Sequence, residues 1–499
     1  MQDYGWLSLL PALTSLALAL ATRKVLLSLA AGVFLGGTLL SHGNPLAGLL
    51  FVIEQELFVQ IAKPFNSQII FIMFLINGFV ALIEGSGAVS AFARTVSRSL
   101  KGSRQTQMAA WIGGLGIFFT DSGNSLILGP IFQPLFRQAK VCKEKLAYIL
   151  DTTSAPDCVL VPFIGWGIYS MSLIQAAYES IGLKEESFIT FVSAIPFQFY
   201  PILTLLAVPL FIITKRDFGL MARFQKKCET SVETEVASDG SKRGGEARSR
   251  VVLIPMIVLF MTMLSGFLFF YWSLGSLPSI KIRVTLMLAY LFATAACVGL
   301  IRKERIQLKT SLLSMYLSGL ARIVPVLGII LLAWSLGDIC SQAGTGRYLS
   351  SFIDSGFPPF LFPVIIFVVG AVTSFATGTS WGTFGILMPI ALPIAHEIGA
   401  PMLVTIGAVL SGGVFGDHCS PISDTTIIAS MGSDCILANH VNTQIPYAVT
   451  AAVAAAFAFL IAGMHPDYWV LPIGVLLLLP VSFLLLKIDK LFRNIVKPS

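Results

Sequence analysis

Charge is scarce in this chain of 499 residues, and its scarcity excludes a soluble fold. Asp, Glu, Lys and Arg together account for 12% of the residues, whereas 55% are hydrophobic, and the mean hydropathy is +0.82. An ordinary soluble domain contains about 25% charged residues. Because a membrane span needs about 20 apolar residues and such stretches recur along the chain, we expect roughly 10 to 14 spans.

The chain also lacks a basic N-terminal segment and any cysteine motif. Met1 is followed by Gln2 and Asp3, and no small-residue cleavage site closes the first apolar stretch. We therefore expect that stretch to remain as a span and not to be removed as a signal peptide. The cysteines form no CxxC pair and have no metal-ligand spacing, which predicts packed or reduced thiols; they are Cys142, Cys158, Cys228, Cys297, Cys340, Cys419 and Cys435.

The positive charges lie in short segments between apolar stretches. A net charge of +7 could suggest nucleic-acid binding, but this distribution is typical of residues that set membrane orientation. Residues 215–250 carry nine Lys or Arg against six Asp or Glu, and the end of the chain after Leu486 is basic. We predict a multi-pass protein of the cell inner membrane, with the lipid bilayer and not nucleic acid as its partner. Residues 215–250 and the C-terminus should be cytoplasmic.

The sequence contains an internal duplication. A shift of 259 residues, the separation of Thr120 and Thr379, aligns two blocks of the chain without a gap. Such repeats are typical of secondary transporters, whose site lies near the midplane where interrupted helices meet. In the first block Gly78, Gly85 and Gly87 align with Gly337, Gly344 and Gly346; in the second Thr120, Gly123, Ile127, Leu128, Pro130, Ile131 and Pro134 align with Thr379, Gly382, Ile386, Leu387, Pro389, Ile390 and Pro393.

Both copies of the second block carry signals that interrupt a helix. Pro130 and Pro134, like Pro389 and Pro393, remove backbone donors, and the glycine before each pair permits irregular backbone. Open backbone at membrane depth persists only where protein or a water-filled cavity covers it. We expect the transported ion to bind in such a cavity.

Four polar islands interrupt the apolar sequence, two in each copy: residues 120–125, 151–157, 377–383 and 416–426. Their hydroxyl and carboxylate oxygens are ligands that a hard cation such as Na+ prefers. A carboxylate withdrawn from water has a raised pKa, which a nearby cation lowers again, so one Asp can hold either H+ or Na+. We predict ion-binding or coupling roles for Asp121, Asn124, Asp151, Thr152, Thr379, Ser380, Asp417, Ser420, Ser423, Asp424 and Thr425, with Na+ at Asp121, Thr379, Ser380 and Asp424.

Each of these roles has a structural alternative. Acids inside spans are rare and usually functional, but an Asp can also cap a helix, and Ser and Thr hydroxyls can bond back to helical carbonyls. His418 is a candidate proton relay, because histidine titrates near physiological pH, or it orients a neighbour. For Glu84 and Asp338 we favour a place at a packed interface over a place on the ion pathway, and we expect Trp381 to pack the broken helix.

Residues 377–390 (TGTSWGTFGILMPI) and 416–430 (GDHCSPISDTTIIAS) closely resemble signature segments of the NhaC-type Na+/H+ antiporters. Further similarity in residues 81–87, 143–153 and 332–337 extends the resemblance over most of the chain outside residues 215–250. The resemblance implies an all-α polytopic membrane protein with inverted internal repeats, two re-entrant hairpins and two broken helices. It also implies exchange of Na+ for H+, without enzyme activity and without a cofactor. The oligomeric state stays open, with a homodimer as one option.

We divide the chain into six segments on this basis. They are N-terminal spans (1–66), a first transport repeat (67–214), a cytoplasmic loop (215–250), connecting spans (251–309), a second transport repeat (310–465), and a last span with a cytoplasmic tail (466–499).

The first island departs from the pattern of many relatives. They have a double acid followed by an aromatic residue where this chain has Thr120, Asp121 and Ser122. The missing carboxylate suits a larger solute, so the alternative is Na+- or H+-coupled exchange of a small organic acid or amino acid. An organic anion needs a cationic or helix N-terminal contact, and because no Arg lies inside the islands we favour Na+/H+ antiport.

A third hypothesis, from a different class, is an intramembrane hydrolase that uses a pair of Asp residues, or Ser420 with His418. A hydrolase needs a nucleophile held by an oriented base. The sequence contains no HExxH or G-x-S-x-G motif. We therefore expect a transporter and not an enzyme.

Overall fold

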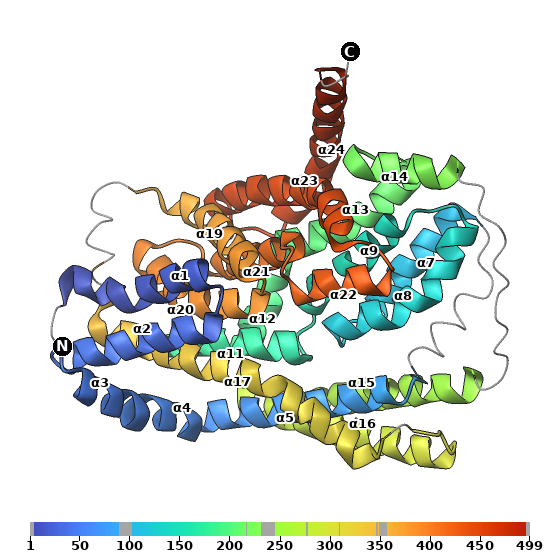
Figure 1. The fold of residues 1–499 in the computed structure, drawn as a ribbon. Coiled ribbons are helices and arrows are strands. Elements are labelled where there is room, and N and C mark those ends of the chain that lie inside the picture. Colours follow the sequence, from blue (N-terminus) through green and yellow to red (C-terminus); the bar gives the residue numbers. More distant parts are fainter. Residues whose placement is uncertain are drawn as a thin grey trace.

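The computed structural model describes residues 4–88, 102–215, 217–230, 245–275, 278–308, 310–345, 348 and 357–495, and all regular elements within these ranges are helical (Figure 1). Within these ranges, ten helices are long and apolar enough to cross a membrane, and an eleventh span results if residues 187–197 and 199–214, bent by 47°, count as one. The prediction of an all-α polytopic protein is confirmed. Gly346, residues 231–244 and the last four residues lie outside the described ranges.

The N-terminal helices begin at residues suited to helix starts. Pro45 and Pro64 each occupy the first position of a helix, where the missing N–H costs nothing. Asn44 caps the first of these helices by accepting from the backbone N–H groups of Leu46 and Ala47. The segment consists of η1 (Gly5–Leu9), α1 (Leu10–Thr22), α2 (Val25–Leu40), α3 (Pro45–Phe51), the π-helix η2 (Val52–Leu57), α4 (Phe58–Ala62) and α5 (Pro64–Gly85).

The next helices are shorter and contain the first two polar islands. They are α7 (Ser103–Leu115), α8 (Asp121–Gln138), α9 (Lys143–Thr152), α10 (Ala155–Cys158), α11 (Gly165–Ser180), α12 (Ser187–Ala194), η3 (Ile195–Phe197) and α13 (Phe199–Thr214). α7 packs against α8, its successor in the chain, and residues 116–120 join the two.

Part of the predicted loop is helical. α14 (Gly219–Thr230) lies in residues 215–250 and packs against α9 and α23. The Gln225 side chain accepts from the Cys142 backbone N–H and donates to the Lys140 carbonyl, and Lys145 pairs with Asp217 at 2.5 Å. Two long apolar helices follow, α15 (Gly245–Leu274) and α16 (Ser279–Lys303), which pack against each other beside α5 (Figure 1).

The remaining described helices lie in residues 312–495. They are α17 (Leu312–Ala343), η5 (Pro359–Leu361), α19 (Phe362–Thr377), α20 (Ser380–Ile398), α21 (Met402–Cys419), α22 (Asp424–Gly432), α23 (Leu437–Met464) and α24 (Val470–Ile495). In α21, 83% of residues are buried, against 22% for the span at residues 45–62, so α21 lies at the centre and α3 and α4 at the edge. α24 packs against α23 and α13 and then extends beyond the other helices (Figure 1).

The helix starts repeat at the offset that the sequence predicts. α19, α20, α21 and α22 each begin 259 residues after α7, α8, α9 and α11. The matched helices also cap alike. Thr120 (φ −149°, ψ 124°) accepts from the Gly123 N–H at 3.1 Å, and Thr379 (φ −152°, ψ 123°) accepts from the Gly382 N–H at 3.4 Å.

Helices of one half pack against helices of the other in two equivalent pairs. α8 packs against α22, and their counterparts α20 and α11 pack against each other. α5 packs against α17, whose C-terminal two-thirds are its counterpart at the same offset. These contacts bring all four polar islands into the middle of the bundle. An inverted relation of the halves, and entry and exit of each hairpin on one side of the membrane, stay predictions.

Candidate ion and substrate site

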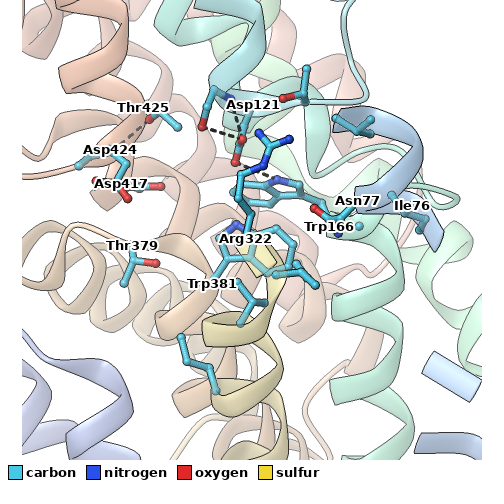
Figure 2. A pocket seen from close by; sticks show the side chains of 18 of the residues that line it. Ile76, Asn77, Asp121, Trp166, Arg322, Thr379, Trp381, Asp417, Asp424 and Thr425 are labelled. Carbon is cyan, nitrogen blue, oxygen red and sulfur yellow. Dashed lines mark hydrogen bonds between the residues drawn. The ribbon is translucent and has the colours of Figure 1, made fainter. Parts of the chain in front are cut away.

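A cavity of about 430 Å³ lies where the two halves meet. Residues from α5, α8, α11, α17, α20, α21 and α22 line it, together with the turns that precede α8, α20 and α22. Figure 2 shows Thr379, Asp417, Asp424 and Thr425 on one side and Trp166 on the other, with Arg322 between them. Six of the residues predicted from the sequence line this cavity: Asp121, Thr379, Asp417, Ser423, Asp424 and Thr425.

The second half supplies a wall rich in oxygen. Ser380 donates to one carboxylate oxygen of Asp417, Oδ2, from its hydroxyl at 2.7 Å and from its backbone N–H at 3.3 Å. The other oxygen, Oδ1, is buried and has no hydrogen-bond partner in the part of the chain that the structure describes. The Ser423 and Thr425 hydroxyls lie 3.1 Å apart on the same wall, where the carboxylate of Asp424 is exposed. Carboxylate and hydroxyl oxygens in this number are ligands for a hard cation.

Two breaks in the backbone present this wall. α19 ends at Thr377, and the next residue, Gly378, has a φ of +68°, which glycine adopts at little cost. α20 begins two residues after Gly378. Between α21 and α22 the chain is irregular at residues 420–423, where the Ser420 hydroxyl donates to the Phe375 carbonyl at 2.8 Å. That bond ties the break to the neighbouring hairpin. Asp424 occupies the first turn of α22, where the helix dipole favours a carboxylate.

The first half supplies a wall of different chemistry. Asp121 Oδ1 accepts from the Ser122 backbone N–H at 2.6 Å and hydroxyl at 3.0 Å, and Oδ2 accepts from the Trp166 indole at 3.2 Å. The Trp166 ring lies 4.8 Å from the ring of Trp381, which α20 of the second half contributes, and both residues line the cavity. The Asp121 carboxylate is therefore engaged by its own half, whereas Asp417 Oδ1 is not.

Arg322 adds a positive charge to the cavity. Its guanidinium, on α17, lies 2.9 Å from Glu84 Oε2, and Glu84 Oε1 accepts from the Thr120 hydroxyl at 2.8 Å. The other predicted interface acid, Asp338, pairs with Lys63 at 3.4 Å away from the cavity. Lys63 and Arg322 are themselves 259 residues apart. The two equivalent basic residues therefore both tie α17 to the region of α5: Arg322 pairs with Glu84 of α5, and Lys63, directly before α5, pairs with Asp338 of α17. Of these two, only Arg322 lines the cavity.

Five predicted ion-binding residues do not line the cavity. Ser380, predicted as a Na+ ligand, is buried and bonds Asp417, and the other four also face protein. The Asn124 amide donates to the Thr153 carbonyl at 2.6 Å, Ser420 bonds as described above, and Thr152 bonds to His418. The fourth, Asp151, is buried in a network between α9, α22 and α23. Its Oδ2 accepts from the Thr426 hydroxyl at 3.0 Å and the Gln444 amide at 2.7 Å, and it lies 3.2 Å from His440 Nε2.

His418 bridges two helices of the first half. Its Nε2 lies 3.2 Å from the Thr152 hydroxyl, and its Nδ1 lies 2.6 Å from the Tyr200 hydroxyl. Ser420, the nucleophile of the hydrolase hypothesis, donates to a backbone carbonyl and makes no bond with His418. The pair therefore lacks the nucleophile–base arrangement that a hydrolase requires.

Three residues at the cavity, Asn77, Trp166 and Arg322, were missed because they lie outside the polar islands. Arg322 carried a signal. It stands inside the long apolar run that forms α17, and a charged residue within a span is usually functional. Asn77 and Trp166 carried none, since a single amide or indole in an apolar helix is common.

Comparison with known proteins agrees with this architecture. A family model described as the Na+/H+ antiporter family matches residues 157–464. An uncharacterized protein of Haemophilus influenzae is 32% identical over 472 residues, covering 91% of this chain and 90% of that protein. The malate-2H+/Na+-lactate antiporter of Bacillus subtilis is 36% identical over 105 residues, or 21% of this chain and 22% of its own. The Na+/H+ antiporter NhaC of Alkalihalophilus pseudofirmus is 28% identical over 141 residues, or 28% of this chain and 29% of its own.

A solved structure shares the fold. The YdaH transporter of Alcanivorax borkumensis superposes with a TM-score of 0.59 at 14% identity, covering 83% of this chain and 88% of that one. Ten apolar helices, the matched fold of a membrane transporter and a family model that spans more than half of the chain all point to one class. The chain is a multi-pass membrane protein and a secondary transporter that belongs to the Na+/H+ antiporter family.

Proposed function

We propose that the chain exchanges Na+ for H+, and that the two ions compete for the carboxylate of Asp417. The observation that carries this proposal is the state of that side chain. One oxygen is held by Ser380, while the other is buried without a hydrogen-bond partner among the described residues, in a side chain that lines the cavity. A buried polar atom without a partner is costly, and a proton or a cation would satisfy it.

The neighbours of Asp417 supply the rest of a cation site. The hydroxyls of Thr379, Ser423 and Thr425 and the carboxylate of Asp424 line the same wall. Na+ bound there would favour the charged form of Asp417, and a proton would remove that charge, so each ion displaces the other. If the loaded site alone can pass between the two sides of the membrane, the competition becomes antiport. Movement of the hairpin tips against α5 and α17 would provide that passage.

We assign the predicted residues that face protein to support and coupling. Asn124 and Ser420 hold the two breaks in place, and Asp151 ties the first half to α22 and α23. The contact between His418 and Thr152 joins the two halves. His418 directly follows the cavity acid Asp417 in the chain, which keeps it a candidate for carrying protons.

The test is transport by purified protein in liposomes, with a pH-sensitive dye inside and a Na+ gradient across the membrane. The wild-type protein should move protons when Na+ is added, and Asp417→Asn should lower the rate by about hundredfold or more, because the amide cannot exchange a proton. Asp467→Asn is the matched control, since that carboxylate lies in an exposed turn between α23 and α24. Proton movement that persists in Asp417→Asn would overturn the assignment, and its absence in the wild type would overturn Na+/H+ exchange itself.

A second candidate is Na+- or H+-coupled exchange of a small organic acid or amino acid. The Bacillus subtilis relative is named as an antiporter of malate and lactate. The cavity, at about 430 Å³, is much larger than a Na+ ion needs and falls in the range of roughly 300–1,000 Å³ found for small-molecule sites. In both candidates the coupling cation uses the same carboxylates. Proton movement that requires an organic solute as well as Na+ would favour the second.

A further inference from the structure

The positive charge in the cavity does not serve a site for Na+ alone. Arg322 lines the same space as three carboxylates, Asp121, Asp417 and Asp424. A guanidinium weakens Na+ binding nearby by Coulomb repulsion, to the extent that its charge is not offset by Glu84. A charged side chain within a span is costly and is found where it has a partner or a substrate.

Glu84 uses only part of the guanidinium. The bond from Arg322 Nη1 to Glu84 Oε2 is its one hydrogen bond to residues within the described part of the chain. Arginine has five N–H donors in a planar fork that matches a carboxylate. The side chain of Arg322 is 56% exposed, so its remaining donors are open to a solute in the cavity. Figure 2 shows the side chain extending from α17 into this space.

The remaining walls suit the other parts of an amino acid. Asp424 presents an exposed carboxylate at the cavity, which would pair with an ammonium group. Trp166 and Trp381 present two indole rings 4.8 Å apart, which would pack against an apolar or cationic side chain. Acids outnumber basic groups three to one in the lining, which disfavours a dicarboxylate without a positive charge.

We propose that the cavity binds a small α-amino carboxylate, with its carboxylate on Arg322, its ammonium group at Asp424 and its side chain against Trp166 and Trp381. This inference rests on the proposal that the cavity is the transport site. It names the transported solute, for which Na+ or H+ would supply the driving force.

The first experiment is a binding measurement. Purified wild-type protein is titrated in a calorimeter with each of the common L-amino acids, in the presence of Na+. For each amino acid that binds, the decarboxylated amine and the 2-hydroxy acid are titrated as well. At least one amino acid should bind, and both matched analogues should bind at least about tenfold more weakly, since each lacks one of the two charged contacts. No binding by any amino acid, or tighter binding of the hydroxy acid, would overturn the proposal.

Variants separate substrate binding from a structural ion pair. Arg322→Gln should weaken amino-acid binding by about tenfold or more, and Arg322→Lys should weaken it less, because lysine keeps the charge but not the fork. Lys63→Gln is the matched control at the equivalent position of the other half, where the ion pair with Asp338 lies away from the cavity. It should leave binding unchanged.

The double variant Glu84→Gln, Arg322→Gln shows whether Arg322 binds the solute or only neutralises Glu84. If Arg322 only neutralises Glu84, removal of both charges should restore binding, and the proposal falls. If Arg322 holds the solute, binding stays weak. Dye-based Na+/H+ exchange in liposomes of the same wild-type protein keeps the two proposals apart. Exchange without amino-acid binding overturns this inference alone, and Arg322-dependent binding without exchange overturns Na+/H+ antiport alone.

Discussion

The two halves of the molecule share a backbone plan but divide the chemistry between them. Four helices start at a constant separation of 259 residues, and the caps at Thr120 and Thr379 differ by only a few degrees in φ and ψ. Pro162 and Pro421, in the breaks before α11 and α22, also match at this offset. Both copies therefore share the irregular backbone, but the side chains at these breaks differ between the copies.

The side chains at equivalent positions have exchanged roles. Asp121 of the first half corresponds to Ser380, and Cys158 corresponds to Asp417, so the acid stands at the hairpin tip in one half and at the broken helix in the other. Where the second break has Ser423, Asp424 and Thr425, the first has isoleucine, glycine and tryptophan at residues 164–166. The second half thus supplies most of the carboxylate and hydroxyl residues that line the cavity, whereas the first half supplies Trp166, which packs against Trp381 of the second.

The largest effect is expected from a substitution where α8 packs against α22, a contact that the equivalent helices α20 and α11 make with different side chains. α8 meets α22 through glycine, because a Cβ on Gly129 would lie 2.1 Å from the Gly432 carbonyl oxygen. At the equivalent positions, the α20 and α11 pair has Met388 and Leu173. Gly129→Ala should lower the free energy of unfolding by about 1–3 kcal/mol, because the two backbones must separate.

Thermal unfolding in detergent measures this effect, and Gly113→Ala in α7 is the control. A Cβ there has nearest neighbours at 3.6 Å, an ordinary contact, so the control should be as stable as the wild type or slightly more stable. Equal stability of the two variants would show that α8 and α22 do not meet as described.

A smaller effect is expected at Ser380 and Asp121, the equivalent first residues of α20 and α8. Ser380→Ala removes the hydroxyl that orients Asp417 and should weaken Na+ binding by about tenfold, or about 1.4 kcal/mol. Asp121→Asn should weaken it by only about threefold, because that carboxylate already bonds Ser122 and Trp166. Direct titration of Na+ measures both, and the reverse order would place the cation on the first half.

The smallest effect is expected at the two caps. Thr379→Val removes one cap bond and should cost about 1 kcal/mol of stability. Thr120→Val removes the same bond and also the one to Glu84, so it should cost somewhat more. Thermal unfolding of the two variants provides the comparison. A smaller loss of stability in Thr120→Val than in Thr379→Val would argue against the hydrogen bond from Thr120 to Glu84.

The part of this architecture that depends on local chemistry could be predicted from the sequence. The spans follow from apolar length, and the 259-residue offset follows from glycines, prolines and threonines that the backbone breaks require. The same local signals predicted the hydroxyl and carboxylate wall, because Asp417, Ser423 and Asp424 are close together in the chain.

Contacts between distant segments could not be predicted in this way. Arg322 reaches the cavity only because α17 crosses beside both tips, and Asp151 turns away from it only because His440 and Gln444 of α23 surround its carboxylate. Neither contact leaves a trace in spacing along the chain. The helix α14 inside the predicted loop is a similar case, since its order depends on Lys140, Cys142 and Lys145 of the first half.

The central claim is that Na+ and H+ compete for Asp417, and the binding of radioactive Na+ to purified protein across a range from about pH 5 to pH 9 tests it directly. If one proton competes with one Na+, the apparent affinity for Na+ should fall by about tenfold per pH unit in the acidic part of the range and level off in the alkaline part. In the alkaline part of the range, Asp417→Asn should bind Na+ at least about tenfold more weakly than the wild type, and its affinity should not change with pH. An affinity for Na+ that does not change with pH in the wild type, or that keeps its pH dependence in Asp417→Asn, would contradict the account.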